Sequence, residues 1–223
     1  MFPRKQPSGQ VYDRITEWVF SMELNWVERL VVNNPIRIAI QNRIVTWMKN
    51  ARVLPEASVI LEIGCGRGAG ARLLHKRFRP RALYGMDIDI KMLRLARRYL
   101  RDDMENTYLC LGDAESLPYK ECSFDAVFGF GPLHHMLDWQ RALREISRVL
   151  KPGGCYFLEE FYPGSYANFL TKRLLVHPEH NRFYSTDLKS ALEGAKIPLL
   201  CSLEVKSYGI IGACVKRDPS LTS

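Results

Sequence analysis

Four glycines occur within seven residues, directly after a short apolar segment. The segment VILEI spans residues 59–63, and the glycines are Gly64, Gly66, Gly68 and Gly70. Glycine lacks a Cβ atom, so the backbone can turn sharply and a ligand can approach it closely. Where such a loop leads from a buried strand into a helix, the free N–H groups of the helix N-terminus are also available to the ligand. We therefore predict a ligand-binding loop at the C-terminal edge of a parallel sheet.

Two acidic residues flank this loop and indicate the kind of ligand. Asp87 ends the next apolar segment, at the separation from Gly64 at which an acid reaches a ribose diol, so the ligand is predicted to contain adenosine. Gly64, Gly66 and Ala69 also satisfy the dinucleotide pattern G-x-G-x-x-G/A. Glu62 argues against a dinucleotide, because it would repel a pyrophosphate and suits an ammonium or sulfonium group. S-adenosylmethionine carries both cations; the alternative for Glu62 is a salt bridge to a neighbouring Arg.

The pattern along the chain predicts the elements that position these residues. Apolar segments alternate with amphipathic ones: strands are expected at 59–63, 82–88, 107–111, 124–130, 155–161, 199–205 and 210–216, and helices at about 72–78, 90–100, 138–150 and 186–194. Asp89 is the expected N-cap of the second helix. The fold class is therefore α/β: a doubly wound, mostly parallel seven-stranded sheet, Rossmann-like, with an antiparallel C-terminal hairpin and added N-terminal helices.

Residues 1–55 lie outside this alternation. One helical pattern covers 19–30, and another begins at Pro35 after Asn34 as N-cap. The second has an expected apolar face of Ile36, Ile40, Ile44 and Trp47 or Met48. We interpret residues 1–55 as a helical extension or lid on a main domain of residues 56–217. An aromatic-rich, lid-like insertion is expected at about 161–184, where ring faces could cover a cation and an apolar substrate.

Composition narrows the class of protein. The chain has 223 residues, 47% of them hydrophobic, which favours one domain with one sizeable core. Without an apolar run long enough to span a bilayer or a secretory leader pattern, we expect a soluble cytoplasmic protein. The six cysteines form no C-x-x-C pair, so we interpret them as reduced, buried residues and predict no metal site. Between residues 67 and 101, eleven Lys and Arg accompany two Asp; we interpret this charge as a solvated helix face.

Six ordered motifs together carry a family resemblance: LEIGCGRG, the acid of YGMDID, GDAESLPY, FDAVFGF, LHH and RVLKPGG. Residues 56–160 resemble class I S-adenosylmethionine-dependent methyltransferases, most closely the small-molecule group that includes ubiquinone and menaquinone biosynthesis methyltransferases. The resemblance implies a cofactor site in which Asp87 holds the ribose hydroxyls and Phe130 lies beside the reacting methyl group. It also implies contacts to the methionine part from Glu62, Gly64, Cys65 and Gly66, and to adenine from Asp113, with Ala114 and Ile88 flanking the ring.

The methyl acceptor is indicated less directly. His134 and His135 follow the fourth strand at the edge of the glycine loop, so one of them is a candidate base; a purely structural role is the alternative. Enzymes that methylate amino groups of bases typically have a polar residue and two prolines there, whereas this chain reads Phe130-Gly131-Pro132-Leu133. We therefore predict a small, apolar or lipid-like acceptor and no nucleic-acid partner. The rivals are a nucleic-acid methyltransferase using the basic helices, a non-catalytic S-adenosylmethionine-binding protein and an NAD-dependent reductase; peripheral membrane contact is left open.

Overall fold

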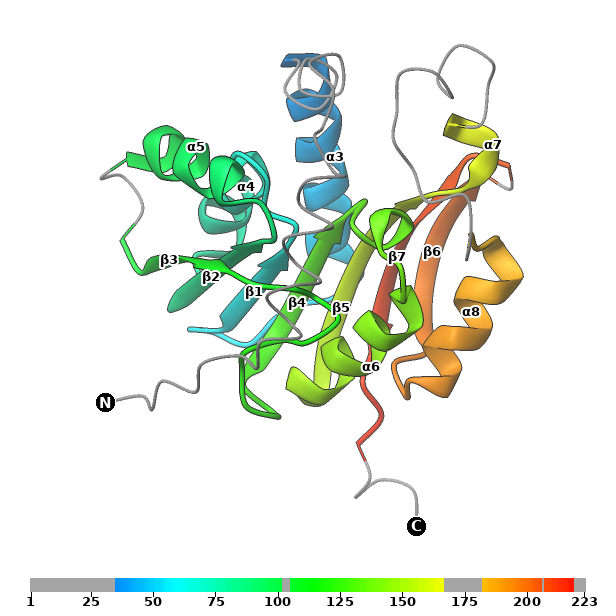
Figure 1. Cartoon of the computed structure of the whole chain (residues 1–223). Helices are drawn as coiled ribbons and strands as arrows, with labels where there is room; N and C mark the ends of the chain where they lie inside the picture. The colour runs from blue at the N-terminus through cyan, green and yellow to red at the C-terminus, as the bar shows by residue number, and fades with distance from the viewer. Residues whose placement is uncertain (1–34, 102–104, 167–181, 206, 219–223) are drawn as a thin grey trace, which may run out of the picture.

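The computed structural model describes residues 35–101, 105–166, 182–205 and 207–218 (Figure 1). The helical pattern at 19–30, the N-cap Asn34 and most of the expected lid insertion lie outside the described residues. Within them, no helix is both long and apolar enough to cross a membrane.

One mixed sheet forms the centre of the molecule, with its seven strands in the order β3-β2-β1-β4-β5-β7-β6 (Figure 1). The strands are β1 (Val59–Ile63), β2 (Ala82–Asp87), β3 (Thr107–Leu111), β4 (Phe124–Phe130), β5 (Leu150–Phe161), β6 (Leu199–Val205) and β7 (Gly209–Val215). Strands β1 to β5 pair in parallel, while β7 lies between β5 and β6 and is antiparallel to both. The predicted fold class is confirmed, including the C-terminal hairpin.

Helices cover both faces of this sheet (Figure 1). On one face lie α3 (Pro35–Ala51), α4 (Ala69–Phe78) and α5 (Ile90–Leu100), and on the other lie α6 (Trp139–Val149) and α8 (Ser185–Gly194). Two short helices, η2 (Leu133–His135) and α7 (Pro163–Tyr166), follow the carboxyl ends of β4 and β5. The Asp89 side chain accepts a hydrogen bond from the Lys91 backbone N–H at 2.7 Å, which confirms the predicted cap of α5.

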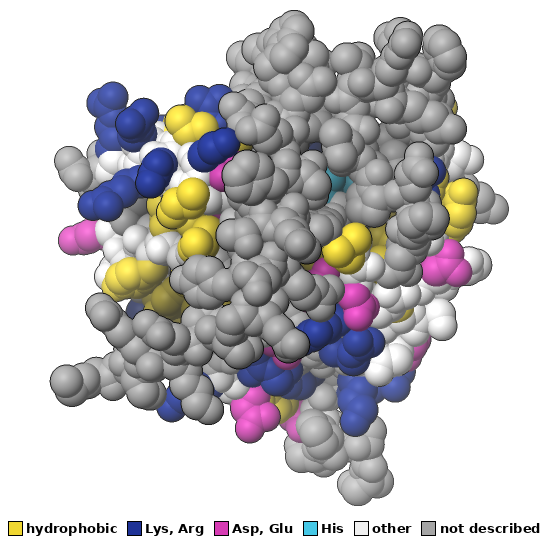
Figure 2. Space-filling view, in the orientation of Figure 1, with side chains coloured by type: hydrophobic (Ala, Val, Ile, Leu, Met, Phe, Trp, Pro, Cys, Tyr) yellow, Lys and Arg dark blue, Asp and Glu magenta, His cyan; other side chains and the backbone are white. Residues whose placement is uncertain are grey.

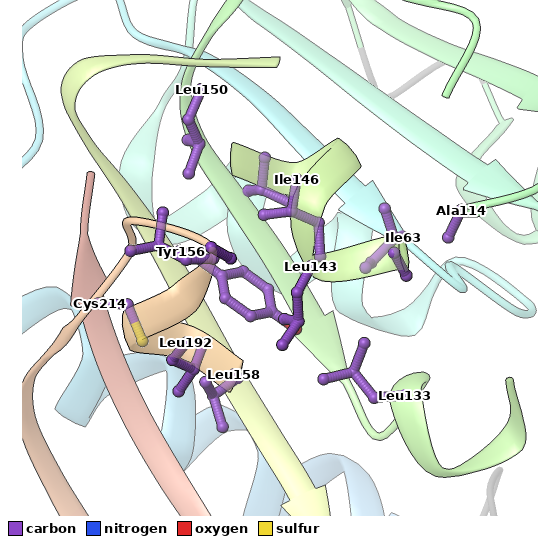
Figure 3. Packing of buried hydrophobic residues seen from close by; sticks show 14 of the residues in the cluster. Ile63, Ala114, Leu133, Leu143, Ile146, Leu150, Tyr156, Leu158, Leu192 and Cys214 are labelled. Atoms are coloured by element: carbon purple, nitrogen blue, oxygen red, sulfur yellow. The ribbon is translucent and has the colours of Figure 1, made fainter. Parts of the chain in front are cut away.

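The two faces have separate apolar cores because the sheet lies between them. Figure 3 shows the core on the α6 side, where Leu143 and Ile146 from α6 meet Tyr156 and Leu158 from β5. Two aromatic residues of the expected lid, Tyr162 and Phe183, are fully or almost fully buried in this same core. On the other face, α3, α4 and α5 supply the helix side of the second core, with Val45, Met48, Ala71, Leu74 and Leu100.

Two expectations about side chains need correction. Ile40 was expected on the buried face of α3 but is 47% exposed, because the helix packs through the stripe Gln41, Ile44, Val45 and Met48. Apolar residues occur on two sides of α3, so periodicity alone does not say which side faces the core. The cysteines are not all buried either: Cys122 is exposed in a turn, with a positive φ of 53°, and Cys110 and Cys201 are half-buried.

Candidate active site

The glycine loop connects the buried strand β1 to α4 at the carboxyl edge of the sheet. Gly66 has a φ of 52°, in the left-handed region that favours glycine. A Cβ atom placed on Gly66 would meet no atom of the described residues within 4 Å, so within this part of the chain its backbone borders open space. The loop also lies where the strand order reverses, since β1 has β2 on one side and β4 on the other. Such a switch point is the usual ligand site of an open α/β sheet.

Asp87 ties this loop to the end of β2. Its Oδ2 accepts a hydrogen bond from the Gly66 backbone N–H at 2.7 Å, and its Oδ1 accepts one from the Asp89 N–H at 2.9 Å. The residue is only 9% exposed, and burial raises the pKa of its carboxyl group although these two hydrogen bonds lower it. A carboxylate oxygen has a second acceptor site, so Asp87 can position the loop and still accept hydrogen bonds from a ligand.

Glu62 is a buried carboxyl group without a full set of partners. Its side chain lies against Gly70, where a Cβ atom would come within 1.9 Å of Oε1, so only glycine leaves room for it. Its Oε2 is buried with no hydrogen-bond partner, and Glu62 is absent from the ion pairs found within the described ranges. Burial, and then the charge of Asp87, raise the pKa of Glu62 well above its ordinary value. A cationic or donor group of a ligand would satisfy this oxygen.

Phe130 and Cys65 complete the wall around Glu62. The Phe130 ring would lie 3.1 Å from a Cβ atom on Gly70, which places it beside the Glu62 carboxyl group. Cys65 is buried, its backbone N–H donates to the Met86 carbonyl at 2.9 Å, and burial raises the pKa of its thiol. The structure thus brings together Glu62, Cys65, Gly66, Asp87 and Phe130 from three neighbouring strands and their loops.

The residues expected at adenine lie next to Asp87. The Gly112 N–H donates to the Asp87 carbonyl at 3.1 Å, which sets the loop after β3 against the end of β2. In that loop, Asp113 Oδ1 accepts a hydrogen bond from the Glu115 N–H at 2.8 Å, so one carboxylate oxygen already stabilises the turn. Ala114 is buried in the core, and Ile88 is half-buried directly after Asp87.

A second group of polar residues lies at the ends of β4 and β5. His134 Nδ1 is 2.9 Å from Glu160 Oε2, and Glu160 Oε1 accepts a hydrogen bond from the Leu133 N–H at 2.9 Å. The His134 side chain is 7% exposed and that of Glu160 is fully buried, which raises the pKa of the Glu160 carboxyl group. The His135 ring stacks on His134 with centroids 4.2 Å apart. Sequence reasoning missed Glu160, although two adjacent acids in the apolar segment CYFLEEF were a visible signal.

The neighbouring acid connects this group to α3. Arg37 donates to both carboxylate oxygens of Glu159, at 2.8 and 2.6 Å, and its guanidinium lies 5.9 Å from the centre of the Phe161 ring. Phe161 in turn makes an edge contact with His134, with ring centres 5.7 Å apart. Sequence reasoning missed the Arg37–Glu159 pair, because the two residues are 122 positions apart and only the fold brings them together.

The sheet order, the glycine loop and the two acids together define an α/β protein with a candidate ligand site at the switch point of its sheet. Residues 61–158 match the family described as "Methyltransferase domain". The match covers less than half of the chain, and it agrees with the resemblance that the motifs carry.

Curated relatives and solved structures agree with this assignment. A fatty-acid O-methyltransferase of Mycolicibacterium smegmatis is 38% identical over 103 residues, which cover 46% of this chain and 36% of that protein. A phthiotriol/phenolphthiotriol dimycocerosates methyltransferase of Mycobacterium ulcerans is 33% identical over 48% of this chain and 38% of its own length. The match thus spans little more than a third of these relatives. Phosphoethanolamine N-methyltransferase 2 of Haemonchus contortus, solved in complex with S-adenosyl-L-methionine, shares the fold with a TM-score of 0.69 at 16% identity, covering 79% of this chain and 53% of that chain.

Proposed function

We propose that this protein is an S-adenosylmethionine-dependent methyltransferase that acts on a small, apolar or lipid-like acceptor. The observation that carries the proposal is the buried Glu62 Oε2, which has no hydrogen-bond partner among the described residues and lies next to the glycine loop at Gly70. A dinucleotide would bring phosphates to this place, where a carboxyl group repels them, whereas an ammonium or sulfonium group would satisfy the oxygen. The family match and the names of the curated relatives support the same activity.

The chain's own residues would hold the cofactor along the carboxyl edge. Glu62, with Gly64, Cys65 and Gly66, would bind the methionine part, and Asp87 would accept hydrogen bonds from the ribose hydroxyls. Asp113 would bind the adenine amino group between Ile88 and Ala114, and Phe130 would border the transferred group. When bound, S-adenosylmethionine supplies an electrophilic methyl group, so the protein has mainly to position the acceptor and exclude water.

His134 is the proposed base on the acceptor side, with His135 as the second candidate. If the Nδ1 proton is donated to Glu160, the lone pair of the neutral ring is on Nε2, which could then take a proton from an acceptor hydroxyl group. Apolar residues accompany His134: Pro132 and Leu133 precede it in the chain, and the Phe161 ring makes an edge contact with it. Such surroundings suit a lipid-like acceptor better than the amino group of a nucleic-acid base, for which residues 130–133 offer no hydrogen-bonding side chain.

The domain organisation belongs to the same proposal. Residues 56–217 would form the methyltransferase domain, and residues 1–55 and 161–184 would supply a cover over the site. The Arg37–Glu159 pair supports part of this assignment, because it fastens α3 of the extension to the end of β5, next to His134. Such a cover would keep water from the acceptor.

The test is a transfer assay with methyl-labelled S-adenosylmethionine and the purified chain. We expect label in the organic phase when hydroxylated lipids, fatty acids or quinols are supplied, and none in RNA or DNA. Label in adenine or cytosine amino groups would contradict the acceptor class. Tight binding of the cofactor without transfer to any acceptor of the panel or of a cell extract would instead favour the non-catalytic binding protein.

A further inference from the structure

The helices α4 and α5 present a strongly cationic surface. Neither helix contains an acidic residue. On α5, the side chains of Met92, Leu93, Ala96 and Leu100 are buried, so the opposite side of the helix faces solvent. That exposed side holds Arg94, Arg97, Arg98 and Arg101, and α4 adds exposed Arg72 and Lys76. Figure 2 shows the dark blue side chains gathered over these helices.

Few acidic residues in the described part of the chain compensate the positive charge of this surface. The ion pairs among the described residues include none of Arg94, Arg97 and Arg98. Asp89, the acid that precedes α5, is engaged in capping that helix. Glu105 is exposed after the helix, and the sequence places Asp102 and Asp103 beside Arg101, outside the described residues. Several exposed cations on one side without acids among them create a positive potential in front of that side.

Apolar side chains accompany these cations. Ile90, in the first turn of α5, is 43% exposed, and Tyr99 is 40% exposed near its end. The Arg72 guanidinium lies 5.3 Å from the centre of the Tyr99 ring, which joins the two helices into one surface. Exposed apolar and aromatic groups between cations are typical of surfaces that contact a lipid interface, where the rings sit at the level of the headgroups.

We propose that this α4–α5 surface docks on an anionic membrane surface. Charge complementarity selects the partner, because lipid phosphates and acidic headgroups attract a field of exposed Arg and Lys. The exposed Ile90 favours lipid over nucleic acid, since an apolar side chain gains from contact with the headgroup–acyl boundary. Ile90 is also only three residues from Asp87, so a docked membrane would lie beside the carboxyl edge of the sheet.

The experiment is sedimentation of the full-length protein with vesicles of phosphatidylcholine and phosphatidylglycerol, compared with vesicles of phosphatidylcholine alone. We expect binding to the anionic vesicles, weakened by salt, and little to the neutral ones. Each cation near such a surface contributes about fivefold to partitioning, so Arg94→Gln, Arg97→Gln and Arg98→Gln together should weaken binding roughly a hundredfold. The matched control removes the same charge from exposed positions outside α4 and α5, by Lys120→Gln, Arg141→Gln and Arg144→Gln. This control variant should change binding by no more than about twofold.

The assay needs neither cofactor nor turnover, so it fails or succeeds independently of the proposed methyl transfer. Circular dichroism of both triple variants is the control for an intact fold. Equal binding of the two triple variants to anionic vesicles would overturn the proposal, as would equal binding of the unchanged protein to neutral and anionic vesicles. Salt-sensitive binding to RNA that the Arg94, Arg97 and Arg98 variant loses, with no binding to anionic vesicles, would assign the surface to nucleic acid instead.

Discussion

Two buried glutamates, Glu62 at the end of β1 and Glu160 at the end of β5, differ in how their oxygens are used. Glu160 accepts from the Leu133 N–H and contacts His134 Nδ1, so each of its oxygens has a partner from the protein. Glu62 has one oxygen that finds no hydrogen-bond partner in the described part of the chain. A buried carboxyl group costs free energy unless it is satisfied, so an orphaned oxygen is usually explained by function. This difference is what we expect if Glu62 faces the cofactor and Glu160 positions His134, as proposed above.

The largest expected effect comes from Gly66→Val, which tests whether the open space at the loop is the cofactor site. A branched side chain there would occupy the space proposed for the methionine part, so we expect no measurable binding of S-adenosylhomocysteine by calorimetry. The left-handed φ adds a strain of about 1–2 kcal/mol, which the domain should survive. Gly153→Val is the matched control, because Gly153 also has a positive φ with nothing within 4 Å and lies outside the proposed site. If both variants bind normally, the loop is not the site.

Asp87→Asn should weaken cofactor binding by about 2–3 kcal/mol, because hydrogen bonds from the ribose to a charged acceptor are replaced by weaker ones. Asparagine keeps only one acceptor oxygen, so one of the two backbone N–H groups of Gly66 and Asp89 loses its partner and the thermal midpoint should fall as well. The measurement is the Kd for S-adenosylhomocysteine with the midpoint determined in parallel. Unchanged affinity would mean that the ribose is held by other residues.

Glu62→Gln should weaken S-adenosylmethionine binding by about 1.5–2 kcal/mol, since the neutral amide loses the attraction to a cation. The same change should leave the affinity for adenosine, which lacks the methionine part, unchanged within twofold. Equal losses for both ligands would show a general disturbance of the site and contradict the role assigned to Glu62.

Glu160→Gln should reduce the turnover number about tenfold while the cofactor Kd stays the same, because Glu160 positions His134 and does not reach the cofactor. A positioning role should also shift the acid limb of the pH–rate profile, which reports the pKa of His134. If Glu160→Gln lost as much cofactor affinity as Glu62→Gln, the different roles proposed for the two glutamates would be contradicted.

The raised pKa of Glu62 also predicts how stability depends on pH. Its folded-state pKa lies well above the value in the unfolded chain, so the folded protein binds more protons and the free energy of unfolding falls as pH rises above the unfolded pKa. Glu160 and Asp87 have raised pKa values as well, so Glu62→Gln should reduce this decline without abolishing it. Denaturant unfolding at several pH values measures the slope; a steeper decline in the variant would contradict the assignment.

Local patterns predicted much of the fold, and they named several residues that the structure brings together around the glycine loop. The strand β1 and the capped start of α5 were found where expected, because burial on both faces and an Asp N-cap are visible within a few residues. The expected buried face of α3 was right at Ile44 and Met48 but wrong at Ile40, since apolar residues on two sides of that helix leave the choice to tertiary packing. The two adjacent acids in β5 were visible in the sequence, but the pairing of Glu160 with His134 and of Glu159 with Arg37 depends on contacts between distant segments, which a single sequence does not reveal.

The central claim is that the glycine loop, Glu62 and Asp87 bind S-adenosylmethionine, and calorimetric titration of the unchanged protein tests it most directly. We predict one site for S-adenosylmethionine and for S-adenosylhomocysteine, and no binding of NAD under the same conditions. Binding to the folded state alone should also raise the thermal midpoint, by about 2.7 kcal/mol of added stability at a hundredfold excess over Kd. Binding of NAD with none of S-adenosylhomocysteine would contradict the account.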